Sequence, residues 1–171
     1  MANPLETLYI LIKVHIGILG FSALISVLSQ RSWNRSEVRL RFWTILVLGL
    51  TGIILSWGPA LLSNLFLKGN SVWIVGCIAG LMGWILITGI FTALYAKVYR
   101  SNERVLIPNW INFIYQVPFT LSLIIFSIGC FKKDNAANYF ITGMFFFTVA
   151  AVGNFICFLV AHSNAKAQTE N

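Results

Sequence analysis

The stretch from Val72 to Ala96 reads VWIVGCIAGLMGWILITGIFTALYA, and none of its residues is charged. A helix of about 20 apolar residues crosses the hydrocarbon core of a bilayer, so this stretch is long enough to span a membrane. Four more apolar stretches of similar length flank it along the chain. The sequence therefore predicts an all-α integral membrane bundle of five transmembrane helices. The predicted spans are about 8–28, 42–62, 72–96, 109–130 and 139–161.

The composition excludes a soluble protein. Hydrophobic residues make up 58% of the 171 residues and charged residues only 10%. A soluble domain carries about 25% charged residues, because its surface must be solvated. The length bounds the chain to a single transmembrane domain over residues 1–171. The start of the chain lacks the basic region of a signal peptide, so we expect the first span to be retained as a helix.

The basic residues predict the orientation of the bundle. Most of them follow the first and third spans: Arg31, Arg35, Arg39, Arg41, Lys97, Arg100 and Arg104. The connections on the opposite side carry only Lys68, Lys132 and Lys133. Short loops rich in Lys and Arg stay in the cytoplasm. We therefore expect the N-terminus outside and the C-terminus inside. Because the basic residues flank membrane spans, the net charge of +7 does not indicate a nucleic-acid partner.

The first cytoplasmic connection is a candidate lipid-facing basic loop, made of Arg31, Arg35, Arg39 and Arg41. Each basic residue near an anionic membrane surface contributes about 1 kcal/mol of attraction. The loop could therefore bind anionic lipid head groups or an acidic partner, although the orientation rule alone also accounts for its charge. If the segment is helical, Glu37 can pair with Arg41 across one turn.

The fourth span carries a polar stripe, which is a row of polar residues on one helical face. Its members are Asn109, Asn112, Gln116, Thr120 and Ser127. One interpretation is a pathway for a small polar solute or a proton. The other is hydrogen bonding between helices, with Asn154 of the fifth span as a partner. Pro118 interrupts the same span and is expected to release the carbonyl of Ile114. No Asp or Glu lies within any of the predicted spans.

His15 is the ionisable residue deepest in the first span, which makes it a candidate functional residue. It could be a hydrogen-bonded packing residue, a proton relay, or a ligand to haem, a quinone or a metal. The other histidine, His162, closes the fifth span. If these two spans run in the same direction, the histidines are separated by on the order of 20 Å along the bundle. That separation argues against one chain clamping a haem between them.

No catalytic or nucleotide-binding motif is present, and Cys77, Cys130 and Cys157 lack the spacing of a metal site. Gly76 and Gly80 form a GxxxG pattern, which serves packing within a bundle more often than dimerisation. We therefore expect no catalytic residue, no metal and no cofactor. The leading interpretation is a non-enzymatic membrane protein that acts through contacts with lipid, membrane subunits or a second copy. A solute or proton pathway is the first alternative, and a redox protein using His15 is the second.

The first third of the chain resembles a family of small multi-pass bacterial membrane proteins without assigned function. The resemblance rests on KVHIGILGFSAL at 13–24, on the basic loop, and on RLRFW at 39–43. The family pattern has an early histidine in the first helix and a basic loop leading into an aromatic second helix. Asn34 and Arg35 stand where the family carries another histidine. The resemblance implies a bacterial inner-membrane location and no particular activity.

Overall fold

The computed structural model describes residues 4–28, 36–65, 69–100 and 109–170, and the regular structure of these residues is helical. The five long helices are α1 (Pro4–Leu28), α2 (Ser36–Leu65), α3 (Asn70–Arg100), α4 (Phe113–Phe131) and α5 (Ala136–Glu170). Two short 3-10 helices precede α4 and α5: η2 (Asn109–Asn112) and η3 (Lys133–Asn135). The prediction of an all-α chain is confirmed.

Each long helix contains a segment apolar enough to cross a membrane, with a mean hydropathy of 1.8 to 2.2. The prediction of five membrane-capable helices is therefore confirmed, and they suggest a multi-pass membrane protein. Four of the helices, α1, α2, α3 and α5, run beyond the predicted spans, because backbone hydrogen bonding continues outside the most apolar residues. The fourth span was predicted from residue 109, but α4 begins at Phe113, after the 3-10 helix η2. The membrane-capable segments consequently include Glu6, Glu37 and Asp134 near their ends. The expectation that no acid lies within a span is wrong in this respect.

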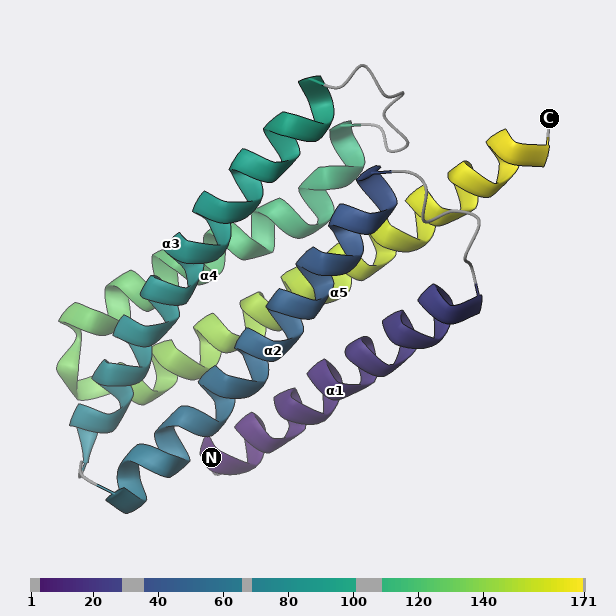
Figure 1. Ribbon diagram of the computed structural model, residues 1–171. Coiled ribbons are helices and arrows are strands. Elements are labelled where there is room, and N and C mark those ends of the chain that lie inside the picture. The colour runs from purple at the N-terminus through teal and green to yellow at the C-terminus, as the bar shows by residue number, and fades with distance from the viewer. Residues whose placement is uncertain (1–3, 29–35, 66–68, 101–108, 171) are drawn as a thin grey trace.

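The helices form one bundle in which α5 is the central member (Figure 1). It contacts all four other long helices, whereas α1 contacts only α2 and α5 within the described residues. Consecutive long helices run in opposite directions, so α1 and α5 run the same way (Figure 1). The beginnings of α2 and α4 therefore lie at the same end of the bundle as the ends of α3 and α5.

Glycines let aromatic rings pack against the helix backbone inside the bundle. An added Cβ at Gly76 would lie 3.0 Å from the ring of Phe140, and one at Gly80 would lie 3.0 Å from the ring of Phe126. Gly143 on α5 receives the other edge of Phe126, where an added Cβ would lie 2.6 Å from the ring. The GxxxG pattern of Gly76 and Gly80 is thus occupied by rings of the same chain, as internal packing requires.

Pro118 lies inside α4, where its ring removes the hydrogen bond to the carbonyl of Ile114. The central helix approaches this carbonyl closely at Gly153. An added Cβ at Gly153 would lie 2.9 Å from Ile114 O. The glycine therefore allows α5 to pack against the backbone of α4 at the level of the proline, next to the site described below.

Candidate functional site

A buried ion pair lies at the end of the bundle where α2 begins. Arg41 is fully buried, and its Nη2 and Nε donate to Glu37 Oε1 at 3.0 and 3.2 Å. The two residues are one turn apart on α2. The predicted pairing of Glu37 with Arg41 is therefore confirmed. The pair brings a positive and a negative charge into the bundle together, which is far less costly than burying either alone.

Arg41 also links α2 to two other helices. Its Nη2 donates to Oδ1 of Asn112 in η2 at 2.9 Å, and its guanidinium lies 5.7 Å from the ring centroid of Tyr95 in α3. Its remaining nitrogen, Nη1, is buried and has no hydrogen-bond partner among the described residues. Arg41 therefore joins three elements that are far apart in the sequence.

The structure corrects the expectation that Arg41 belongs to a lipid-facing basic loop. Because α2 begins at Ser36, Arg41 lies inside the helix, on the face that packs into the bundle. Arg39, two positions earlier, is exposed. Arg31 and Arg35 lie outside the described residues. The sequence offered one signal for a buried pair. A glutamate is followed one turn later by a basic residue, at the start of an apolar run.

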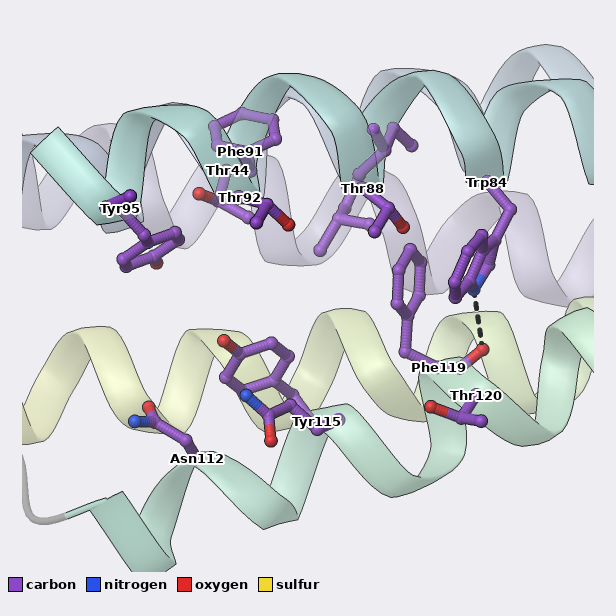
Figure 2. A pocket seen from close by; sticks show the side chains of 14 residues that line it. Thr44, Trp84, Thr88, Phe91, Thr92, Tyr95, Asn112, Tyr115, Phe119 and Thr120 are labelled. Carbon is purple, nitrogen blue, oxygen red and sulfur yellow. Dashed lines mark hydrogen bonds between the residues drawn. The ribbon is translucent and has the colours of Figure 1, made fainter.

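A pocket of about 530 Å³ lies between α2, α3 and α4, next to this ion pair (Figure 2). Such a volume is in the range of small-molecule sites, roughly 300–1,000 Å³. The residues that line it carry either apolar groups or uncharged polar groups. The apolar ones are Leu48, Trp84, Ile87, Phe91, Ala96 and Phe119. The polar ones are Thr44, Thr88, Thr92, Tyr95, Asn112, Tyr115, Gln116 and Thr120.

The two ends of the pocket differ (Figure 2). Asn112 and Tyr95 lie at one end, where they contact Arg41. Trp84 and Phe119 lie at the other end, with their rings stacked at 5.1 Å. The indole Nε1 of Trp84 donates to the carbonyl of Phe119 at 2.9 Å, so the polar atom of the indole is already satisfied. One end therefore carries the amide of Asn112 beside the ion pair, and the other carries the stacked rings of Trp84 and Phe119 together with the hydroxyl of Thr120 (Figure 2).

The pocket opens along the side of the bundle. Its exposed lining residues all belong to α3 and α4, and they are Thr92, Ala96, Gln116 and Thr120. The residues from α2, Thr44 and Leu48, are buried and form its inner wall. The pocket therefore has an opening between two neighbouring helices.

The structure divides the predicted polar stripe. Asn112, Gln116 and Thr120 line the pocket. Ser127 does not line it, and its hydroxyl donates to the carbonyl of Leu123 in the same helix at 2.8 Å. The side chain of Asn109 lies outside the described part of the chain. The pocket reaches from Asn112 in η2 to Thr120 in α4, so three stripe residues share one site.

Asn154 does not form a hydrogen bond with the stripe. It is fully buried on the central helix, and neither its Oδ1 nor its Nδ2 has a hydrogen-bond partner among the described residues. It is also absent from the lining of the pocket. The proposed partnership between Asn154 and the stripe of α4 is therefore not present in this structure.

His15 occupies a separate buried position between α1, α2 and α5. Its Nε2 lies 3.0 Å from Thr148 Oγ1, and its ring centroid lies 6.2 Å from that of Phe147. The ring fills the space above Gly52, where an added Cβ would overlap with it. The hydroxyl of Thr148 also lies 2.8 Å from the carbonyl of Met144, to which it can donate. Thr148 then accepts from Nε2–H of His15, whereas in the other tautomer of His15 the hydroxyl donates to Nε2.

This position is closed on the sides that a large cofactor would need. The imidazole is fully buried and wedged between Gly52 and Thr148, which leaves no open face for a porphyrin. His162 lies fourteen residues beyond Thr148 on α5, or about 21 Å along that helix. The two histidines are therefore too far apart to bind the same metal. Within the described residues, no group of three or more His, Cys, Asp or Glu side chains could hold a metal ion.

The lining residues of α2 and α3 were missed by the reasoning from sequence. Thr88, Thr92 and Tyr95 recur at four and three positions, which places them on one face of α3. That spacing inside an otherwise apolar span was the available signal.

No protein-family model, no curated protein and no solved structure matches this chain. The resemblance of the first third to bacterial membrane proteins stays a prediction.

Proposed function

We propose that this protein is a non-enzymatic membrane protein that binds a single amphiphilic molecule from the bilayer in the pocket between α2, α3 and α4. The observation that carries the proposal is the opening of this pocket between α3 and α4. When α3 and α4 cross a bilayer, an opening between them faces the lipid. A molecule dissolved in the bilayer can therefore enter sideways, without passing through water.

The two ends of the pocket match the two ends of an amphiphile. The end at Asn112 and Tyr95 offers hydrogen-bonding groups close to the beginning of α2 and α4 (Figure 2). The end at Trp84 and Phe119 is deeper along α3 and offers aromatic rings. A head group would lie near the membrane surface and a hydrocarbon chain would lie nearer the midplane, as both do in the surrounding bilayer.

Filling the pocket should remove the bound molecule. Ala96 lines the pocket and is exposed at its opening, so a tryptophan at this position projects into the space that the occupant needs. Ala93→Trp is the matched control, because Ala93 is exposed on the same helix and does not line the pocket. We expect the Ala96→Trp protein to retain less than about a tenth of the bound amphiphile, a loss of at least about 1.4 kcal/mol in binding.

The measurement is mass spectrometry of lipids that remain bound after purification in mild detergent and release in organic solvent. The unchanged protein and the Ala93→Trp protein should both carry the same species in near-stoichiometric amount. If Ala96→Trp carries as much of it as Ala93→Trp, the molecule binds elsewhere on the bundle and the proposal is wrong.

We further propose that the chain lies in the inner membrane of a bacterium, with its N-terminus outside and its C-terminus in the cytoplasm. The basic residues support this orientation, because Arg39 and Lys97 are exposed at the end of the bundle where α2 begins and α3 ends. The pocket's hydrogen-bonding end then lies in the cytoplasmic half of the bilayer. A fluorescent protein fused to the C-terminus should light up in the cytoplasm. Activity of a C-terminal alkaline phosphatase fusion, which requires export, would contradict the orientation.

A further inference from the structure

The described lining of the pocket contains many hydrogen-bonding groups but no charged one. None of the fourteen residues that line it is Asp, Glu, Lys, Arg or His. A charged group enters a site of low dielectric only when an opposite charge or several hydrogen bonds compensate for its lost hydration. The lining therefore disfavours an ionised occupant.

The buried ion pair beside the pocket does not change this balance, because its two charges neutralise each other. Arg41 and Glu37 form a buried pair at 3.0 Å, beside the hydrogen-bonding end of the pocket. The positive charge of Arg41 acts on the pocket through Asn112, whose Oδ1 accepts from Nη2. With its oxygen held by Arg41, the amide of Asn112 presents its Nδ2 hydrogens as donors.

A second donor lies deeper in the pocket, at Thr88. Its hydroxyl is buried and has no hydrogen-bond partner among the described residues. Figure 2 shows this hydroxyl on the side of α3 that faces α4. A buried hydroxyl that lacks a partner loses free energy relative to one that is satisfied, so an occupant that offers an oxygen acceptor is favoured here.

From these observations we infer that the pocket selects an uncharged amphiphile whose head carries oxygen acceptors such as ester, carbonyl or hydroxyl groups, and rejects amphiphiles with an ionised head. This inference rests on the proposed function, because it specifies the chemistry of the molecule bound in the same pocket. The two donors, Asn112 Nδ2 and the Thr88 hydroxyl, provide the recognition. An amphiphile with an ionised head is rejected because no charge in the described lining compensates for its lost hydration.

The fluorescence of Trp84 can report which molecule occupies the pocket. It lines the aromatic end of the pocket, where the hydrocarbon chain of the occupant would lie. Brominated acyl chains quench the fluorescence of a tryptophan that they touch. The chain has six tryptophans, so the part due to Trp84 is the difference between the protein and its Trp84→Phe variant. The two probes are diacylglycerol and phosphatidic acid with identical brominated chains, which differ only by the phosphate group.

We expect diacylglycerol to quench Trp84 at a mole fraction at least about tenfold lower than phosphatidic acid requires. In the Gln116→Lys variant, a cation stands at the exposed opening of the pocket, and the preference should shift towards phosphatidic acid. Since Gln116 is exposed, this substitution leaves the packing of the bundle intact.

The outcomes separate this inference from the proposed function. Equal quenching by the two probes, or stronger quenching by phosphatidic acid, would overturn the selection against charge while amphiphile binding stands. An unchanged preference in Gln116→Lys would show that the charge of the pocket does not set selectivity, and would also overturn the inference. If neither probe quenches Trp84, the pocket does not take amphiphiles at all and the proposed function itself fails.

Discussion

Replacing Glu37 with alanine should destabilise the folded bundle by about 3–5 kcal/mol, because it leaves the guanidinium of Arg41 buried without an opposite charge. Arg41 is fully buried and Glu37 is 5% exposed, so solvent does not replace the lost partner. The hydrogen bond to Asn112 remains, but a neutral amide compensates only part of a buried charge. The free energy of unfolding in detergent, followed by circular dichroism during titration with a denaturing detergent, measures the loss.

Two further variants test this explanation. Arg39→Ala removes an exposed charge two positions away on the same helix, and should change the free energy of unfolding by less than about 0.5 kcal/mol. The double variant Glu37→Met with Arg41→Met removes both charges and should recover most of the stability lost in Glu37→Ala. A loss in Glu37→Ala no larger than that in Arg39→Ala would mean that water reaches the pair.

The same pair explains what could be predicted about the candidate site. Glu37 and Arg41 are one turn apart, so their pairing follows from helical geometry once the segment is known to be a helix. The bond from Arg41 to Asn112 joins residues 71 positions apart, and depends on which helices become neighbours. Helix neighbours are set by packing over the whole bundle, which a local pattern does not contain. The burial of Arg41 was missed for this reason.

The pocket shows the same division between local and long-range information. The polar stripe was visible on α4, because its spacing places Asn112, Gln116 and Thr120 on one face. The opposing face of α3 carries Thr88 and Thr92, but only the packed structure places it against α4. A stripe on one helix is half of a site, and its other half can be identified only when the arrangement of the helices is known.

The fold itself was predictable because membrane spans are determined locally. About 20 apolar residues suffice to satisfy both the bilayer and the backbone hydrogen bonds, so hydropathy identifies each helix without knowledge of its neighbours. The helix ends were less predictable. The second span was predicted to begin at residue 42, whereas α2 begins at Ser36, because Arg39 and Arg41 were assigned to the basic loop.

The close contact between α1 and α2 predicts a second large effect of a substitution on the stability of the bundle. Gly52 lies under the ring of His15, and an added Cβ would overlap with that ring. The ring cannot move away freely, because its Nε2 is hydrogen-bonded to Thr148 of α5. We therefore expect Gly52→Ala to lower the free energy of unfolding by about 1–3 kcal/mol, as overpacked interiors do. Thermal unfolding in detergent, followed by circular dichroism, measures this change.

Gly20→Ala is the matched control, because Gly20 lies on α1, the helix that carries His15, and an added Cβ there would meet nothing within 4 Å. Its stability should be unchanged or slightly raised, since alanine is the better helix former. If the imidazole is the group that resists the new methyl, His15→Ala should tolerate Gly52→Ala with much less additional loss than the unchanged protein does. Equal losses in the two backgrounds would place the strain in the helix backbones, and the imidazole would then not be what sets the distance between α1 and α2.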